Sequence, residues 1–158
     1  MKLTATTLLA VASAATARIV GVAAPKEITP GSAFTIVLIT ENYIQSVLDV
    51  SAASGLSPNV FPDSLGTYLS SSPLGPSQSN VLTNITMPAQ LPTWPVAGTQ
   101  YHLTAAITSL YGATSSPITI IFSLPIEVAN TTSSELVSST NGVNACKGWR
   151  IIQQSTVH

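Results

Sequence analysis

Hydrophobic residues recur at every second position in the segment SPITIIFSLPIEV, and this alternation constrains the fold more than any other feature. A period of two predicts a β-strand with one buried face, which here holds Ile118, Ile120, Phe122, Leu124, Ile126 and Val128. Pro125 and Glu127 fall on the opposite face, which predicts a sheet edge or a strand end. The segment AFTIVLIT alternates as well, but both of its faces are apolar, as in a central strand, with Phe34, Ile36 and Leu38 opposite Val37 and Ile39.

Clusters of Pro, Gly, Ser and Asn separate several such short segments, which predicts an all-β fold, a β-sandwich of about seven strands. The pattern GTQYHLTAA places Tyr101 where immunoglobulin-like and fibronectin III-like sandwiches have a corner tyrosine, with its ring in the core and its hydroxyl bonded to the preceding loop. Only YIQSVLDV suggests helical spacing, through Ile44, Val47 and Leu48. We expect a short helical turn or bend there, leading into a strand near residues 49–55. The predicted core contains Phe34, Ile36, Leu38, Tyr101, Leu103, Ile107, Ile120, Phe122 and Leu124.

The N-terminal segment MKLTATTLLAVASAATA, residues 1–17, has the features of a secretory signal peptide. A charge at Lys2 precedes a short apolar run, and Ala15 and Ala17 form an A-x-A cleavage site before Arg18. The run is shorter than the roughly 20 residues that a membrane span needs. The C-terminal GWRIIQQSTVH is polar where a lipid-anchor signal is hydrophobic. We expect cleavage between Ala17 and Arg18, secretion to the extracellular space and no stable membrane anchor.

The chain after the signal peptide suits one domain, which we expect to span residues 18–129. The region that follows is rich in Ser and Thr, so residues 130–158 are predicted to form a disordered tail. Five Lys and Arg residues against six Asp and Glu, scattered along the chain, predict no nucleic-acid partner. Cys146 is the only cysteine; it could link two chains, and the sequence leaves the oligomeric state open.

Sequence patterns for catalysis, cofactors and metals are missing. His102 and His158 have no acid placed to build a Ser-His-Asp site. Asp49 and Asp63 have no flanking motif of a glycosidase pair. One cysteine and two scattered histidines do not have the spacing of a zinc site. We therefore expect no enzyme activity, no catalytic residue, no cofactor and no metal.

Two sequons predict N-glycosylation in a secreted protein. Asn84-Ile-Thr lies in a segment whose alternation turns Asn84 outward, and Asn130-Thr-Thr follows the last predicted strand. Asn84 and Asn130 are therefore the candidate glycosylation sites.

Four motifs occur in order: ENYIQSVLDV at 41–50, DSLGTYLSSSPLGPSQSNVL at 63–82, NIT at 84–86 and SLYG at 109–112. In order and spacing they resemble the fungal necrosis-inducing secreted protein family, from about residue 18 to residue 128. The resemblance implies a secreted effector that suppresses plant immunity by binding and inhibiting kinases associated with pattern-recognition receptors, and that triggers plant cell death in some members. The kinase domains of such receptor complexes lie on the cytoplasmic side of the plasma membrane, whereas the glycosylation sequons suit an extracellular protein, so the sequence leaves open whether the protein acts outside the plant cell or after host-cell entry. The resemblance assigns no catalytic residue.

The first of these motifs is the candidate partner-binding surface. Glu41, Asn42, Tyr43 and Gln45 would present hydrogen-bonding groups on a loop or bend, and Tyr43 would add an amphipathic contact of the kind favoured in interfaces. In the alternative interpretation, polar residues here cap the turn and Tyr43 fills the core.

A second hypothesis is a cell-wall or carbohydrate-binding module. Trp94 lies between Pro92 and Pro95 in a stiff loop, so its ring is either a displayed platform or a plug over one end of the core. Together with Tyr68 it could stack on sugar rings, which makes Trp94 a further candidate binding residue.

Overall fold

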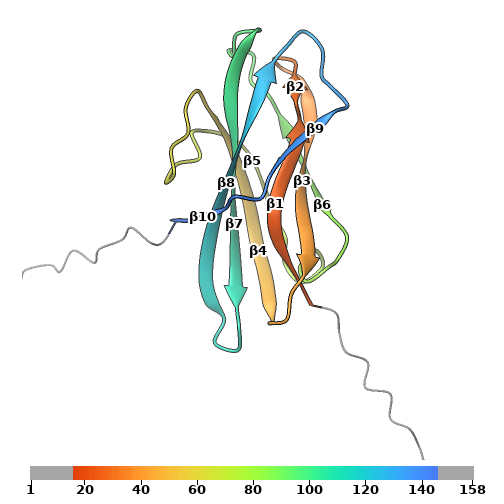
Figure 1. The fold of residues 1–158 in the computed structure, drawn as a ribbon, viewed down its shortest axis with the longest axis vertical. Coiled ribbons are helices and arrows are strands. Elements are labelled where there is room, and N and C mark those ends of the chain that lie inside the picture. The colour runs from red at the N-terminus through yellow and green to blue at the C-terminus, as the bar shows by residue number, and fades with distance from the viewer. Residues whose placement is uncertain (1–15, 146–158) are drawn as a thin grey trace, which may run out of the picture.

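The structure is a computed structural model that describes residues 16–145. These residues form strands joined by turns and loops (Figure 1). The strands are β1 (Ala17–Pro25), β2 (Glu27–Ile28), β3 (Ala33–Asn42), β4 (Val47–Ser57), β5 (Thr67–Pro73), β6 (Ile85–Gln90), β7 (Thr99–Tyr111), β8 (Ser116–Val128), β9 (Leu136–Ser139) and β10 (Val143–Asn144). In the described part of the chain, no helix is long and apolar enough to cross a membrane.

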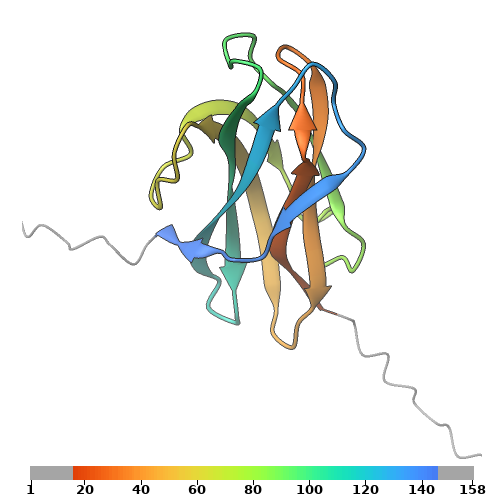
Figure 2. The same cartoon turned by 45° about the horizontal axis from the view of Figure 1, so that its top comes forward.

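The strands make two sheets that face each other as a sandwich (Figures 1 and 2). One sheet has the order β6-β3-β1-β9 and the other the order β10-β8-β7-β4-β5, with β2 as a parallel partner of β8. The prediction of an all-β sandwich is confirmed. The count differs from about seven because β2, β9 and β10, of only two to four residues, are too short to show a periodic pattern.

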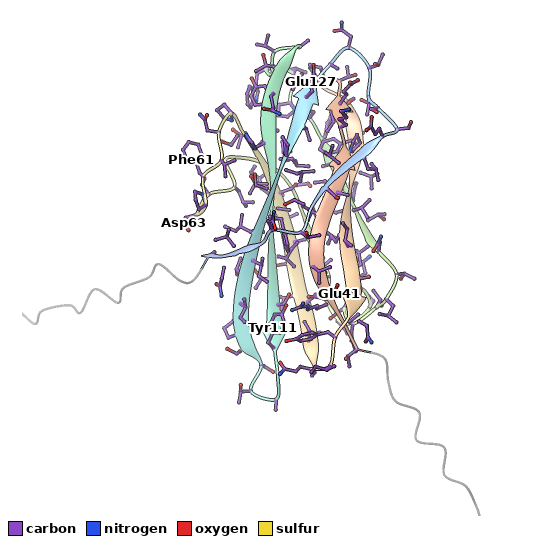
Figure 3. All side chains as sticks on the ribbon, in the orientation of Figure 1. Glu41, Phe61, Asp63, Tyr111 and Glu127 are labelled. Atoms are coloured by element: carbon purple, nitrogen blue, oxygen red, sulfur yellow. The ribbon has the colours of Figure 1, made fainter. Side chains whose placement is uncertain are left out.

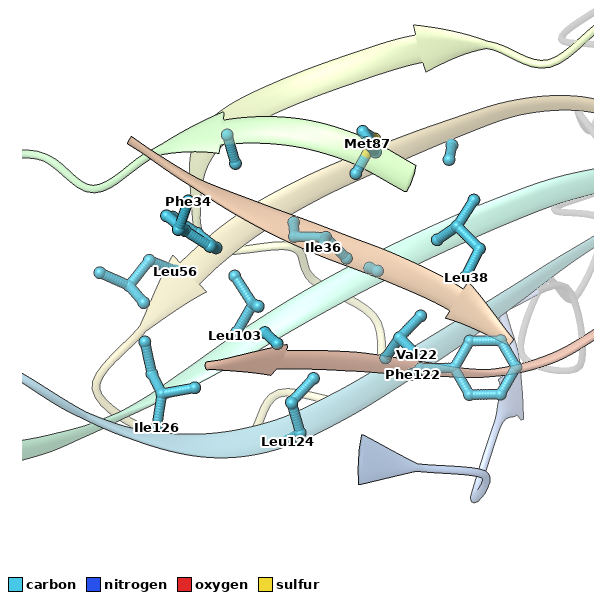
Figure 4. Packing of buried hydrophobic residues seen from close by; sticks show 14 of the residues in the cluster. Val22, Phe34, Ile36, Leu38, Leu56, Met87, Leu103, Phe122, Leu124 and Ile126 are labelled. Carbon is cyan, nitrogen blue, oxygen red and sulfur yellow. The ribbon is translucent and has the colours of Figure 1, made fainter. Parts of the chain in front are cut away.

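The core lies between the sheets and contains most of the residues that the alternation predicted (Figure 4). Ile118, predicted on the buried face of β8, is only half-buried and does not belong to the core cluster. On β3, Phe34, Ile36 and Leu38 are buried, while Val37 and Ile39 on its outer face are half-buried. This agrees with the central position of β3 between β6 and β1. Of the predicted core residues, only Ile120 is partly rather than fully buried, and it packs against the main cluster.

The strand β8 is close to a sheet edge, as Pro125 and Glu127 predicted. Its outer side pairs with β10 only at residues 120–121 and with β2 only at residues 127–128. Pro125 lies between these two short pairings, where its missing N–H removes no ladder hydrogen bond.

The helical turn predicted for YIQSVLDV does not form. Residues 43–46 make a tight connection between β3 and β4, and β4 starts at Val47 and includes the strand predicted at 49–55. Ladder pairing with β7 begins at Val47 itself, opposite Tyr111. This long-range pairing overrides a helical spacing that lasts for less than two turns.

Residues 130–145, predicted to be part of a disordered tail, are folded against the sandwich. β9 pairs with β1 and β10 pairs with β8, and Val137 packs against the core. Ser and Thr residues do not prevent this, because strand pairing uses main-chain groups. We call residues 130–145 the strap. Cys146 and the rest of the predicted tail, residues 146–158, lie outside the described residues.

The predicted tyrosine corner is present only in part. Tyr101 is buried, and Leu103, Ala105 and Ile107 continue its face into the core. The hydroxyl of Tyr101, however, forms none of the hydrogen bonds found within residues 16–145. Its ring instead meets the Trp94 ring edge-on, with centroids 5.8 Å apart.

Candidate partner-binding site

The turn between β3 and β4 brings together four of the predicted partner-binding residues at one end of the sandwich (Figure 3). Glu41, Asn42 and Gln45 are exposed, and Tyr43 is half-buried. Sequence reasoning did not single out Ile44, in the middle of this turn. Its side chain is 93% exposed, more than any other large hydrophobic side chain within residues 16–145. Its spacing from Val47 and Leu48 had indicated only a short helical turn.

An arginine and two tyrosines form the base of this turn. The guanidinium carbon of Arg18 lies 4.4 Å from the centroid of the Tyr43 ring, and the Tyr43 and Tyr111 rings meet edge-on at 6.1 Å. The Tyr43 hydroxyl donates to Oε1 of Gln45 at 3.3 Å, and Nη2 of Arg18 lies 3.2 Å from Oε1 of Glu41. Such cation–π and edge-on aromatic contacts hold the rings in fixed positions. We call Arg18, Glu41, Tyr43, Gln45 and Tyr111 the tyrosine cluster.

Arg18 and Tyr111 could not be assigned to this cluster from the sequence. They lie far from the turn along the chain and reach it only because β1 pairs with β3 and β7 pairs with β4. The pKa of Tyr111 is raised, first by its burial and second by the charge of Asp49, while Arg18 opposes the shift. The Tyr111 hydroxyl is therefore protonated, and a hydrogen-bond donor, at neutral pH.

A cleft opens between the two sheets beside the tyrosine cluster. It has a volume of about 430 Å³ and is lined by Arg18, Ile19, Val20, Glu41, Tyr111, Ile120, Phe122, Thr140 and Gly142. A second pocket of about 340 Å³ shares some of these residues and extends the hollow to Tyr43, Gln45, Ile118 and Asn144. The cleft has an apolar floor and an ion pair at its rim, so it suits an amphipathic contact.

A buried carboxylate, that of Asp49 on β4, lies near the tyrosine cluster and stabilises the strands that carry it. Asp49 is only 2% exposed; the Ser109 hydroxyl donates to its Oδ1 at 2.6 Å, and the Asp49 amide donates to the Ser79 hydroxyl at 2.7 Å. Burial raises the pKa of Asp49, and the hydrogen bonds from Ser109, Ser79 and the Asn80 backbone oppose the rise. Asp49 therefore holds β4, β7 and the loop at 74–84 together.

The four motifs that carry the family resemblance meet at this end of the molecule. In the second motif, the amides of Leu74 and Gly75 donate to the Val50 carbonyl of the first motif. In the SLYG motif, the Ser109 hydroxyl donates a hydrogen bond to the Asp49 carboxylate, and the Tyr111 ring meets the Tyr43 ring edge-on. The amide of Gly112 donates to the Ser46 carbonyl. In NIT, Asn84 Oδ1 accepts from the Thr40 amide at 3.1 Å. Residues from all four motifs therefore contribute to one supported turn.

The predicted signal-cleavage site falls at the start of β1. Ala17 is fully buried, and its amide donates to Oδ1 of Asn80 at 2.6 Å. The Tyr43 amide donates to the Thr16 carbonyl at 2.8 Å, and the Thr16 hydroxyl donates to the Tyr43 carbonyl. Cleavage between Ala17 and Arg18 removes these bonds but keeps Arg18 in the tyrosine cluster. Residues 1–15 of the predicted signal peptide lie outside the described residues.

Trp94, the fifth candidate binding residue, belongs to a different surface. It is 50% exposed and packs on Tyr101 near the start of β7, whereas Tyr111 is the last residue of that strand. An extended strand separates the two positions by roughly 30 Å. A single contact with both Trp94 and Tyr43 would therefore need a partner that spans the sandwich.

Both predicted glycosylation sites are exposed. Asn84 lies just before β6 with Ile85 and Met87 buried, so its side chain points outward as predicted. Asn130 lies in the exposed loop that follows β8. Their positions allow glycans without loss of core packing, and the occupancy stays a prediction.

The residues considered for catalysis are not brought together. Asp49 is buried in the first half of β4, whereas Asp63 is exposed in the loop beyond the end of that strand. His102 is half-buried and lines a separate, apolar pocket with Phe61 and Val143. Within residues 16–145, no three His, Cys, Asp or Glu side chains gather in a way that could hold a metal ion.

The fold and this end of the molecule together define a small β-sandwich protein with a candidate recognition surface. The model of the Nis1 family matches residues 15–127. The chain is 43% identical over 129 residues to necrosis-inducing secreted protein 1 of Colletotrichum orbiculare, covering 80% of this chain and 79% of that protein. It is 41% identical over 127 residues to the protein of the same name in Colletotrichum higginsianum, covering 79% and 88%. The chain belongs to the Nis1 family, as its motifs indicated, and it is a secreted extracellular protein.

Proposed function

We propose that this protein is a non-enzymatic secreted effector that causes necrosis in plant tissue, and that it suppresses immunity by binding and inhibiting kinases associated with pattern-recognition receptors. Family membership and the names of its relatives support the effector role. The observation that carries the binding mode is Ile44, 93% exposed on a turn that the tyrosine cluster holds in place. On this proposal the protein enters the host cell, because the kinase domain lies inside it.

The turn has the physical properties of an interface anchor. A fixed apolar tip loses little conformational entropy on binding, and interface energy concentrates in a few central residues, among which aromatics are enriched. Ile44 and Tyr43 would supply the apolar contact, with exposed Glu41, Asn42 and Gln45 as the polar rim. The Arg18–Glu41 ion pair is partly exposed, so it contributes orientation more than affinity.

We expect Tyr43→Ala to weaken binding to the cytoplasmic domain of a receptor-associated kinase by more than about 1–2 kcal/mol. The change removes the ring that contacts Arg18 and Tyr111. Ile44→Ser should weaken binding comparably and leave the melting temperature unchanged, because this side chain is almost wholly exposed. The measurements are calorimetric titration and phosphotransfer assays across a panel of such kinases, with glycosylated and unglycosylated protein.

The control is Tyr43→Phe, which keeps the ring and loses only the bond to Gln45, so it should bind nearly as wild type does. Failure of the wild-type protein in either form to bind any kinase of the panel would refute the kinase mechanism. Unchanged affinity in both Tyr43→Ala and Ile44→Ser, with binding intact, would refute the turn as the binding site.

We also propose that the sandwich is of the immunoglobulin or fibronectin III type. The support is the placement of β5 beside β4, in the sheet that contains β7 and β8. In variable-type immunoglobulin domains the additional strands after the third likewise join the sheet of the last two long strands.

The second candidate function is carbohydrate binding, and one observation favours it. Tyr68, 61% exposed, shares a pocket of about 290 Å³ with Pro92 and Thr93, next to the half-exposed Trp94. Two accessible aromatic rings near one hollow suit the apolar faces of sugar rings. We expect any retention on insoluble chitin or glucan to vanish in Trp94→Ala. Retention that persists in this variant, or no retention by wild type, would exclude this function.

A further inference from the structure

A pocket on the outer face of one sheet lies apart from the tyrosine cluster. Its floor is formed by three residues of β8 and one of β7: Ile121, Ser123, Pro125 and His102. The β8 residues alternate with Phe122 and Leu124, which lie in the core, so the pocket is on the other side of the sheet. Ile121 faces away from the core but is only 8% exposed. Other segments of the chain therefore cover this part of the sheet.

Two segments that are distant in the sequence form the walls of the pocket. We call residues 58–66, which follow β4, the projecting loop; it contributes Val60 and Phe61 (Figure 3). The strap contributes Val143. These three side chains are 53%, 51% and 50% exposed, so they converge on the hollow without filling it. An apolar molecule bound there would cover exposed apolar surface on both segments.

The projecting loop holds the Phe61 ring at the pocket. The Ser64 amide donates to the Phe61 carbonyl at 3.2 Å, which closes a turn with Pro62 directly after Phe61. Proline in this place fixes the backbone angle that such a turn needs. Where the loop returns to β4, a Cβ at Gly55 would clash with the Leu65 carbonyl, so the chain passes close over the strand. A wall that is ordered in advance lowers the entropy cost of binding.

The floor contains a polar group without a partner among residues 16–145. The Ser123 hydroxyl is buried and forms no hydrogen bond with any described residue. Buried hydroxyl groups are usually hydrogen-bonded, because an unpaired one has lost its water without compensation. The core does not account for this group, since Ser123 belongs to the pocket side of the sheet. A ligand that carries a hydroxyl group would supply the missing partner.

Charge and size narrow the class of ligand. Among the described residues, no Asp, Glu, Lys or Arg lines the pocket. The charged residues that follow its lining in the sequence, Asp63 after the loop residues and Glu127 after Pro125, are both acidic, which disfavours an anion. The volume is about 290 Å³, roughly twice that of a ~150 Å³ apolar cavity that accepts one benzene ring. The pocket therefore suits a neutral molecule of about two rings.

We propose that this pocket binds a small, neutral, apolar molecule of about two fused rings that carries one hydroxyl group. The rings lie on Ile121 between Phe61 and Val143, and the hydroxyl pairs with that of Ser123. Within residues 16–145, this pocket shares no lining residue with the cleft beside the tyrosine cluster. The proposal therefore does not depend on kinase binding, and the apolar walls separate it from a sugar site.

The test titrates the full secreted chain with 2-naphthol, a fluorescent two-ring alcohol, and with 2-methylnaphthalene, which has a methyl group in place of the hydroxyl. Both should bind saturably at one site. Ser123→Ala should weaken 2-naphthol by about three- to tenfold, the contribution of one hydrogen bond, and leave the affinity for 2-methylnaphthalene unchanged. Phe61→Ala should weaken both compounds by at least about threefold, because both lose the aromatic contact. Ionised 2-naphthoic acid should bind more weakly than 2-naphthol.

Val96→Ala is the matched control, because Val96 is 64% exposed but lies outside the pocket, so neither affinity should change. If Phe61→Ala does not unfold cooperatively, Val60→Ala replaces it. No saturable binding to the wild-type protein would overturn the proposal. So would equal losses of both compounds in Ser123→Ala, unchanged affinity in the wall variant, or tighter binding of the acid. An equal loss in Val96→Ala would also overturn it, because the compounds would then bind exposed apolar surface without a defined site.

Discussion

Replacing Phe122 with alanine is expected to lower the free energy of unfolding by about 3–5 kcal/mol. The Phe122 ring is 2% exposed and lies in the main core cluster, in the half of the sandwich that also contains Val22 and Leu38 (Figure 4). It also forms part of the cleft floor, and the strap crosses it at Gly142. Removal of the ring therefore loses core contacts and the support of the strap together. Urea denaturation followed by far-UV circular dichroism measures the change.

Phe61→Ala is the matched control, because it makes the same chemical change at a residue that is 51% exposed. That residue lies in the projecting loop after β4 (Figure 3), where a surface substitution costs only about 0.5 kcal/mol. Similar losses for the two variants would show that Phe122 does not fill the core as the structure places it. A far-UV spectrum of the wild-type protein dominated by helix would contradict the whole sandwich.

The long strands could be predicted because, in a strand with one buried face, apolar side chains recur at every second position. Phe34, Ile36 and Leu38 on β3 and Phe122 and Leu124 on β8 carry that signal within a few neighbouring positions. The position of the connection between β3 and β4 could also be predicted, since Glu41, Asn42, Tyr43 and Gln45 interrupt the apolar pattern together.

The parts that escaped prediction depend on contacts between distant segments. Nothing near Arg18 or Tyr111 in the sequence indicates that their side chains flank Tyr43; strand pairing alone brings them there. The helical turn suggested by the spacing of Ile44, Val47 and Leu48 was wrong, because an apolar spacing over less than two turns fits a connection between strands equally well. The strap was misread because Ser- and Thr-rich composition indicates disorder only where no open strand edge is within reach.

Ser109→Ala is expected to lower the free energy of unfolding by about 1.5–3 kcal/mol at neutral pH, the usual contribution of a hydrogen bond to a charged group. The Ser109 hydroxyl donates to the buried Asp49 carboxylate at 2.6 Å, and its loss leaves that charge poorly compensated. Below the ordinary Asp pKa of 3.8 the carboxyl is neutral, and the loss should shrink to about 0.5–1.5 kcal/mol. Ser123→Ala is the matched control: its hydroxyl is buried without a hydrogen bond among the described residues, so its removal should cost little at any pH.

The pH dependence of the wild-type protein follows from the same carboxyl. Burial raises the pKa of Asp49 in the folded state above 3.8, its ordinary value. Between the two pKa values the folded protein keeps a proton that the unfolded chain has released, so the stability contributed by Asp49 decreases as the pH rises through this window. Ser109→Ala removes a bond that opposes the shift, so the decrease should become larger and extend to higher pH. Denaturation curves of wild type, Ser109→Ala and Ser123→Ala on both sides of the window measure it; an equal loss for Ser109→Ala at every pH would show that Asp49 stays neutral when buried.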